Sequence, residues 1–595
     1  MRLKSDIACF CASLLMLWAV SAAFPGNLEC AERVKLSVPI MKTSEIKSGM
    51  KGYGLTVFTG IKPVRFEVGV IDVLKNVFPK HDLILIKCSH PIIKKAHIIA
   101  GMSGSPIYIE NKLIGALAYG WSFTKEPIAG VTPIEWMLEE MNEPETPARK
   151  SGGRILHRER GAEKSKHSNP SGLKRLQVPF YISGMGNLPS SVLEKLRKEG
   201  EKHGISLMQG TGGSSAHRNI GADKLVPGAA LGVSLMRGDI DFTGIGTVTH
   251  REANRIIAFG HPMLFAGQEV PMPVTTAYIH GVLPSQWTSF KFGSPSKPVG
   301  TLTQDRWPAV AGTLGRNCPM IPVTGTVRNP TNSRTETVNV EMINNRSLSP
   351  YMLFLSSVYL MLLEGTAWTD FAVDYSLHME FEKHGVLDLK GLDMAWGGYM
   401  VYDPYTALSQ IMNNPFEPVT PKKIEFTFKT IHKRIDARLQ RAWFDQLEVQ
   451  PGNEVKLHIQ VHPYEGKPQE IVFPVKIPPH LDEGKYDIVV AGGDNWAVQM
   501  PTPPAESVRD IFTQLKMQYR PTTLVAVLEL PTVGVGFKGK LFRQLPSSVF
   551  GTLVSSSSGG VSTFQDGIHF TYETPWYLTG DSQRLKIIVK QLAEE

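Results

Sequence analysis

The sequence predicts a mainly β protein made of several domains, and three observations carry this prediction. The chain has 595 residues, which at roughly 150 residues per domain corresponds to about four domains. Residues 36–120 consist of short apolar segments separated by turns, as in all-β domains. Residues 455–461 alternate strictly between apolar and polar side chains, which is typical of a half-buried antiparallel strand.

The composition is that of a globular protein. Hydrophobic residues make up 42% and charged residues 20% of the chain, which excludes a disordered or collagen-like polypeptide. The net charge is +8, but nine Lys and Arg against two Glu lie within residues 147–175. We therefore expect no nucleic-acid partner and interpret residues 146–176 as an exposed basic linker. A contact of this linker with an anionic surface is the alternative.

The N-terminus has the pattern of an export signal. Residues 1–23 contain basic Arg2 and Lys4, then an apolar run of about 14 residues, and end in small residues. The apolar run is too short to span a bilayer. We therefore expect export to the periplasm or cell envelope. The apolar run at 351–363 is also short, so it predicts a buried helix, and we expect no transmembrane helix after the signal.

Cysteines are too few for a disulfide framework. Cys9 and Cys11 lie in the signal, which leaves Cys30, Cys88 and Cys318. Either one bridge joins Cys88 to Cys318, or both are unpaired buried thiols. No CxxC or HExxH motif occurs, so we expect no metal and no organic cofactor.

The first domain contains several predicted strands and one predicted helix. The strands are expected at 55–58, 64–70, 83–87, 107–109 and 113–118. Thr132, Pro133 and Glu135 form a capping-box pattern, which predicts a short helix over 134–141.

Later elements follow from the same patterns. An amphipathic helix is expected from Ser191 to about His203, and strands resume near Ala230. The alternating segment at 455–461, followed by apolar segments at 471–477 and 486–490, predicts a small β-sandwich.

The predicted domain organisation is a signal peptide followed by six regions. They are a serine-bearing half at 36–145, the linker at 146–176, a histidine-bearing half at 177–330, a connecting region at 331–425, the β-sandwich at 426–500, and a C-terminal β-rich region at 501–595.

A candidate nucleophile lies in a glycine-rich turn at 101–106, between apolar segments. Gly101 and Gly104 supply the backbone freedom that exposes Ser103 Oγ on a tight turn. The N–H groups of Gly101 and Ser103 are the expected oxyanion donors. A plain Gly/Ser turn between strands is the alternative.

A candidate base follows a second apolar strand. His261 comes directly after Gly260 at the end of the segment 255–258, where an imidazole can face a cleft. His250 is the rival base, and a structural histidine is the alternative for either residue.

These two segments resemble the SpoIVB-type serine peptidase family. The first carries GMSGSPI at 101–107, NKLIGA at 111–116 and IEWMLEE at 134–140. The second carries GIGTVT at 244–249 and AFGH at 258–261. The resemblance covers well under half of the chain. It implies a trypsin-like two-barrel domain built from two separated segments, with Ser103 as nucleophile and His261 as general base.

This sequence departs from the family in two ways. The serine half precedes the histidine half, as in a circular permutation; geometry and not chain order defines such a site. The aspartate of the family aligns with His90, which in its neutral form is no anionic partner for His261. Asp239 or Asp241 is the possible orienting residue in its place, unless a dyad operates.

The resemblance thus implies an exported serine endopeptidase that acts on a protein or peptide substrate without a cofactor. The alternative is a catalytically inactive pseudopeptidase that binds proteins in the envelope as a scaffold. The presence of both Ser103 and His261 favours the enzyme, and His90 favours the scaffold.

Overall fold

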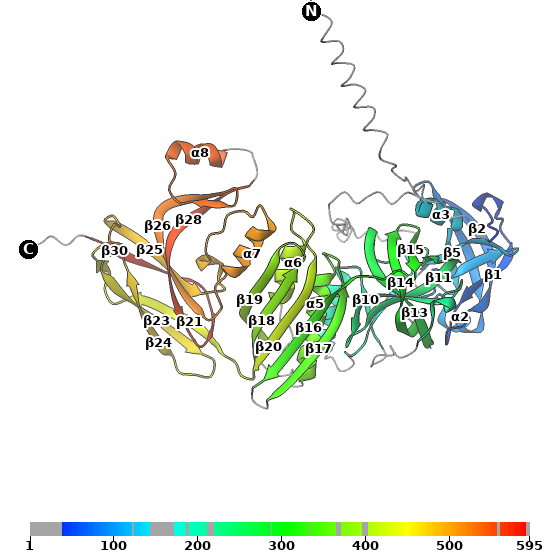
Figure 1. Ribbon diagram of the computed structural model, residues 1–595, viewed down its shortest axis with the longest axis horizontal. Helices are drawn as coiled ribbons and strands as arrows, with labels where there is room; N and C mark the ends of the chain where they lie inside the picture. The colour runs from blue at the N-terminus through cyan, green and yellow to red at the C-terminus, as the bar shows by residue number, and fades with distance from the viewer. Residues whose placement is uncertain are drawn as a thin grey trace, which may run out of the picture.

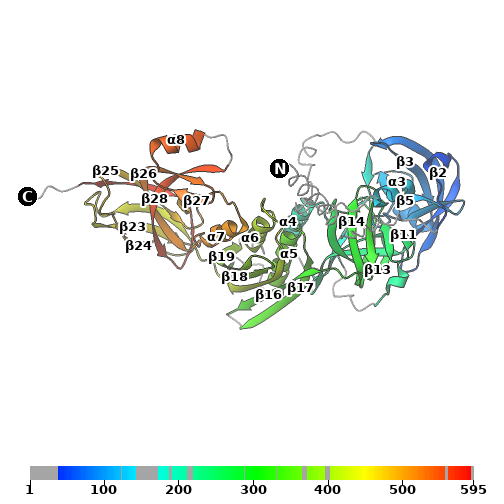
Figure 2. The same ribbon diagram turned by 45° about the horizontal axis from the view of Figure 1, so that its top comes forward.

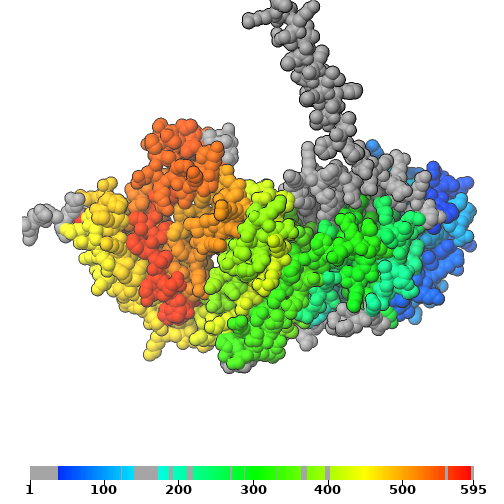
Figure 3. Space-filling view, in the orientation of Figure 1, coloured from blue at the N-terminus to red at the C-terminus, as the bar shows by residue number. Residues whose placement is uncertain are grey.

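The computed structural model describes most of the chain (Figure 1). The described residues are 38–121, 124–142, 172–185, 190–210, 219–286, 288–330, 333–364, 371–395, 403–555 and 560–590. The predicted signal, Cys30 and most of the predicted basic linker lie outside these residues. The parts follow one another along the long axis, from the blue N-terminal barrel through the green middle to the part coloured yellow, orange and red (Figure 3).

The N-terminal part is a closed six-stranded barrel. Its strand order is β1-β2-β3-β6-β5-β4, and pairing of β4 with β1 closes it. Apolar residues alternate along β2, where Phe66, Val68 and Val70 are buried between exposed or half-buried neighbours. The elements are η1 (Thr43–Glu45), β1 (Lys51–Thr56), β2 (Val64–Phe78), β3 (His81–Ser89), α2 (Pro91–Ala96), β4 (Pro106–Ile109), β5 (Lys112–Trp121), β6 (Ile128–Pro133) and α3 (Ile134–Asn142).

A second six-stranded barrel follows the first. Its order is β10-β13-β14-β15-β12-β11, and pairing of β10 with β11 closes it. The strand β11 is buried over nearly its whole length, because Val248 packs in the core of this barrel while Thr247 and Thr249 contact the first barrel. The strands are β10 (Ala230–Gly238), β11 (Phe242–Glu252), β12 (Arg255–Ala258), β13 (Gly267–Leu283), β14 (Phe290–Arg306) and β15 (Ala309–Leu314).

Short elements flank the two barrels. The strand β7 (Leu173–Arg175) pairs with β5 at the edge of the first barrel. Beside the second barrel lie β8 (Pro179–Ile182), α4 (Ser190–Glu201), β9 (Ser206–Gln209) and η3 (Ala222–Lys224). Seen from a second direction, the two barrels remain side by side (Figure 2).

The sheet of the second barrel continues through β10 into a middle layer. Its further order is β17-β16-β20-β18-β19, and α5 packs on β16 and β17. The helix α5 is almost entirely apolar and buried, which confirms the buried helix predicted at 351–363. The elements are β16 (Met320–Asn329), β17 (Arg334–Ile343), α5 (Ser349–Glu364), β18 (Phe371–Phe381), β19 (Gly385–Ala395), α6 (Asp403–Met412) and β20 (Pro421–Ile431).

The C-terminal part is a β-sandwich of two sheets around one core. One sheet has the order β24-β23-β21-β29, from β21 (Asp436–Phe444), β23 (Glu454–Pro463), β24 (Gln469–Lys476) and β29 (Tyr577–Thr579). The other has the order β22-β30-β25-β26-β27 with β28 on β26, from β22 (Glu448–Val449), β25 (Gly484–Gly492), β26 (Thr523–Phe537), β27 (Lys540–Phe542), β28 (Val561–Glu573) and β30 (Gln583–Val589). Beside these strands are η4 (Trp496–Val498), α7 (Val508–Lys516) and α8 (Ser547–Ser555).

The predicted fold class is confirmed: the protein is mainly β, with trypsin-like barrels from two separated segments and a following β-sandwich. The domain limits differ from those expected. The middle layer at 331–425 continues the sheet of the second barrel, and the sandwich joins 426–500 with 501–595 because β25 pairs with β26 and β30. The first sandwich strand begins at Asp436, since β20 belongs to the preceding sheet.

One local expectation, the capping box at Thr132, differs from the structure. The helix α3 forms where expected, but the Thr132 hydroxyl donates to the Gly260 carbonyl and Glu135 accepts from Thr43, so no capping box forms. Cys88 and Cys318 are free thiols, buried and half-buried. Among the described residues, no helix has the length and apolar character needed to span a membrane.

Candidate active site

The turn that carries Ser103 is shaped by two glycines. Gly101 and Gly104 have φ angles of +91° and +93°, in the left-handed region that favours glycine. The N–H of Met102 donates to the Ile99 carbonyl, and the N–H of Ser105 donates to the Met102 carbonyl. The turn therefore reverses the chain tightly between Ile99 and β4.

The N–H groups of Gly101 and Ser103 remain unused in this turn. Within the part of the chain that the structure describes, neither N–H has a hydrogen-bond acceptor, whereas those of Met102, Gly104 and Ser105 do. Two unpaired N–H groups on one turn are what an oxyanion hole requires.

His261 follows a backbone reversal at the end of β12. Phe259 and Gly260 both have left-handed φ angles, +68° and +69°. The His261 Nδ1 lies 2.8 Å from the Pro262 carbonyl oxygen, so Nδ1 carries the proton and Nε2 is the free lone pair of the neutral ring. Burial lowers the pKa of His261 to about 4; the hydrogen bond to Pro262 opposes this shift, and the charge of Arg175 adds a smaller lowering to it.

Contacts between the two barrels bring the serine turn against β11, the strand that pairs with β12 ahead of His261. The N–H of Thr247 donates to the Ser103 carbonyl, and the hydroxyls of Thr247 and Thr249 donate to the carbonyls of Gly101 and Gly104. A Cβ on Gly104 would lie 2.0 Å from the Thr247 oxygen, so only glycine permits this approach. Residues 101–104 of the first barrel and 247–249 of the second thus meet along one boundary, which we call the seam.

The two candidate reactive side chains are both buried near this seam. Ser103 is 0% exposed and His261 is 2% exposed. Ser103 Oγ and His261 Nε2 each have no hydrogen-bond partner among the described residues, so they are not bonded to each other. Both atoms are therefore unengaged and shielded from water.

The three possible orienting residues have other partners. The His90 ring caps α2 through the N–H of Ile92 and stacks on Phe58, with ring centroids 4.4 Å apart. Asp239 accepts from the N–H of Asn339. Asp241 lies beside the Ser183 hydroxyl, which accepts from its N–H, and burial raises the pKa of Asp241 to about 6.

The partner of His261 Nδ1 is thus a backbone carbonyl where the family has an acid. The rival base His250 contacts Glu252, with 3.3 Å between His250 Nε2 and Glu252 Oε2. Burial lowers the pKa of His250.

Asp305 is a site residue that the sequence reasoning missed. Its carboxylate accepts hydrogen bonds of 2.7 to 3.0 Å from the N–H groups of Met263, Leu264 and Ala266. Burial raises the pKa of Asp305, while these three donors favour the ionised form. Asp305 therefore fixes the loop that directly follows His261. No local pattern in β14 distinguishes it from a surface aspartate, because its partners lie about 40 residues away.

Arg175 also joins the two barrels, which corrects the assignment of residues 146–176 to an exposed linker. It lies on β7, and its guanidinium is 4.3 Å from the ring centre of Phe265 and 5.5 Å from that of Trp307. The final residues of the predicted linker are therefore part of the folded unit, because β7 adds to the edge of β5.

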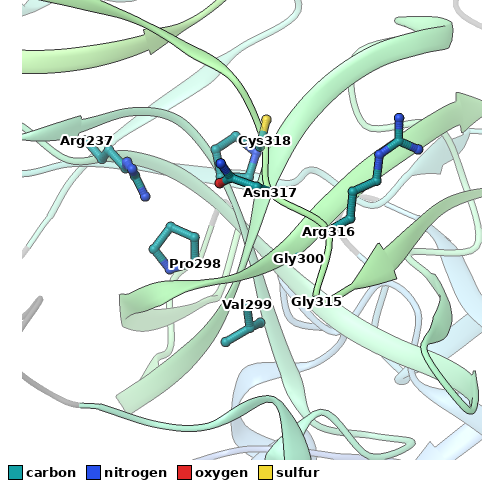
Figure 4. Close-up of a pocket in the computed structure, with 9 residues that line it drawn as sticks. Arg237, Pro298, Val299, Gly300, Gly315, Arg316, Asn317 and Cys318 are labelled. Atoms are coloured by element: carbon teal, nitrogen blue, oxygen red, sulfur yellow. The ribbon is translucent and has the colours of Figure 1, made fainter.

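A pocket lies elsewhere in the second barrel. It has a volume of about 210 Å³ and is lined by Arg237, Pro273, Pro298, Val299, Gly300, Gly315, Arg316, Asn317 and Cys318. Figure 4 shows the guanidinium groups of Arg237 and Arg316 on either side of Asn317 and Cys318, so the two charges do not converge. Arg237 is also paired with Glu341. Neither Ser103 nor His261 lines this pocket.

Comparison with known proteins gives one finding. Neither the curated proteins nor the solved structures yield a match to the chain. Residues 25–138 match the family model described as SpoIVB peptidase S55, and this match includes the turn that carries Ser103. Over these residues the serine-bearing segment of this protein is similar to the SpoIVB peptidase family.

Proposed function

We propose that the protein is an exported serine endopeptidase of SpoIVB type, active in the periplasm or cell envelope, that cleaves a protein substrate through an acyl-enzyme. The observation that carries this proposal is the seam between the barrels. There a serine on a tight glycine turn, with two unused N–H groups, lies against the strands that lead to a neutral histidine with a free Nε2.

In the proposed reaction Ser103 Oγ forms a bond to the peptide carbonyl carbon while its proton passes to His261 Nε2. The carbonyl oxygen becomes an oxyanion that accepts from the N–H groups of Gly101 and Ser103. The tetrahedral intermediate then breaks its C–N bond, and the proton on His261 Nε2 passes to the leaving amine. Water then attacks the acyl-enzyme with the same base, which releases the acid and restores Ser103.

The burial of both reactive groups adds a condition to this proposal. Because Ser103 and His261 are shielded from water, the substrate reaches them only after the seam opens. The Pro262 carbonyl orients His261 without supplying a negative charge, so we expect a weaker base than in a complete triad. The same two observations favour the second candidate, an inactive pseudopeptidase that binds envelope proteins.

A fluorophosphonate probe separates the two candidates, because it reacts covalently only with an activated serine. We expect slow labelling of the full chain, loss of labelling in Ser103→Ala and strongly reduced labelling in His261→Asn. Ser105→Ala in the same turn is the matched control and should still label. An unlabelled wild-type protein, or a Ser103→Ala protein that labels equally, would favour the pseudopeptidase.

A further inference from the structure

The seam contains a buried lysine that the proposed reaction does not use. Lys291 lies near the start of β14 and is 0% exposed. Its Nζ donates to the hydroxyls of Thr56, 2.8 Å away, and Thr247, 3.0 Å away. Among the described residues its Nζ has no carboxylate partner, which is unusual because buried lysines are almost always paired.

The lysine is in contact with the turn that carries the oxyanion donors. A Cβ placed on Gly101 would lie 3.3 Å from Lys291 Cδ, so the methylene chain packs against this glycine. The backbone N–H of Lys291 donates to the Ala100 carbonyl, 3.0 Å away. That carbonyl belongs to the peptide group that supplies the Gly101 N–H, so this bond polarises an oxyanion donor.

A hydrogen-bond chain leads from the lysine to the same turn. Lys291 Nζ donates to Thr247 Oγ1, and Thr247 Oγ1 donates to the Gly101 carbonyl, 2.9 Å away. Thr247 is also the residue whose N–H donates to the Ser103 carbonyl. The amine thus orients the hydroxyl of Thr247, which fixes the peptide between the two oxyanion donors.

We propose that Lys291 is a positioning residue of the peptidase reaction: through Thr247 and its packing on Gly101, it holds the oxyanion turn in the geometry that the transition state requires. The proposal rests on the proposed function. Burial lowers the pKa of Lys291 to about 7, so holding a charged amine here destabilises the folded protein. A residue that lowers stability is expected where function requires it.

The test measures the rate of fluorophosphonate labelling together with the melting temperature of the full chain. We expect Lys291→Met to label about tenfold more slowly, because one orienting hydrogen bond is lost. Its melting temperature should not fall. Thr247→Val, which keeps the side-chain shape, should slow labelling by a similar factor. The double variant should be no slower than the slower single variant, because both act through one chain of bonds.

Lys297→Met is the matched control, since Lys297 is exposed on the same strand, and it should label at the wild-type rate. Unchanged labelling of Lys291→Met, or slower labelling only in step with a lower melting temperature, would overturn the positioning role and leave the proposed function intact. An unlabelled wild-type protein would overturn both proposals. If Thr247→Val does not fold, the comparison of Lys291→Met with Lys297→Met decides alone.

Discussion

The carbonyl oxygen of Ser103 accepts a hydrogen bond from the N–H of Thr247, 2.9 Å away, across the boundary between the two barrels. This bond joins the candidate nucleophile to β11, which pairs with β12, the strand that precedes the candidate base. Around it the hydroxyls of Thr132, Thr247 and Thr249 each donate to a carbonyl of the opposite barrel. The site therefore depends on how the barrels pack and not on either barrel alone.

Replacing Gly104 tests this packing. In Gly104→Ala the new Cβ would lie 2.0 Å from the Thr247 oxygen and 2.4 Å from the Phe259 nitrogen, both backbone atoms. We expect a loss of about 3 kcal/mol in the free energy of unfolding and a loss of fluorophosphonate labelling. Gly49→Ala is the control: Gly49 has φ +84° with no atom within 4 Å, so only about 1 kcal/mol of backbone strain is expected. Equal losses in the two variants, measured by urea denaturation, would contradict the tight seam.

The buried His261 predicts a pH dependence of stability. Its pKa is about 4 in the folded protein and 6.5 unfolded, so the folded state binds fewer protons between these values. The contribution of neutral His261 to stability is therefore complete above pH 6.5 and is lost as the pH falls to 4. Over this range the free energy of unfolding of the wild type should fall by about 3 kcal/mol more than that of His261→Asn. Urea denaturation of both proteins between pH 4 and pH 7 measures the difference.

His378 serves as a control of opposite sign for that measurement. Its hydrogen bond to Asp388 raises its pKa. Its contribution is therefore present at low pH and lost as the pH rises through the folded pKa, and His378→Asn should remove it. A wild-type protein whose difference from His261→Asn does not change with pH would contradict the burial of a neutral His261.

Asp305 should contribute more to stability and to labelling than Asp239, one of the orienting residues predicted from the sequence. Asp305→Asn turns one of its accepting oxygens into a donor that faces backbone N–H groups. We expect a loss of about 3 kcal/mol in the free energy of unfolding and slower labelling, because the loop after His261 is released. Asp239→Asn changes the acceptor of one exposed hydrogen bond, that from the Asn339 N–H. It should lower the free energy of unfolding by less than about 1 kcal/mol and leave labelling unchanged. The reverse order of the two variants would contradict this role.

Lys291→Met should stabilise the protein at neutral pH. The folded-state pKa of Lys291 is about 7 against 10.5 unfolded, so charging the buried amine costs stability below pH 7. This cost fades as the pH rises from 7 to 10.5, because the unfolded chain then also loses its proton. We expect Lys291→Met to gain about 3 kcal/mol at pH 7, after loss of its hydrogen bonds, and less at pH 9.5. A variant less stable than the wild type at pH 7 would contradict an uncompensated buried amine.

Local patterns predicted much of the secondary structure. The strands expected at 64–70, 83–87 and 455–461 form within β2, β3 and β23, because alternation of apolar side chains reports one buried face. The glycines at 101 and 104 likewise predicted the tight turn, because their backbone freedom is a property of the residue itself.

Side-chain partners across the fold were not predictable in this way. Asp305 and Lys291 lie on one strand among residues of mixed polarity, and the partners of each side chain come from distant parts of the chain. The capping-box pattern at Thr132 failed for the same reason, since the Gly260 carbonyl of the second barrel takes its hydroxyl.

The amino-acid sequence by itself determined the mainly β class, the serine turn and the resemblance of the region around Ser103 to a peptidase family, because each depends on neighbouring residues. Only the tertiary structure decided that the Ser103 turn meets β11 and the chain reversal before His261, that a carbonyl occupies the place of the acid, and that a buried lysine bonded to two hydroxyls lies behind the oxyanion turn. These features arise where two separately closed barrels pack, and residues more than 140 positions apart are joined there by packing and hydrogen bonds that no local pattern records.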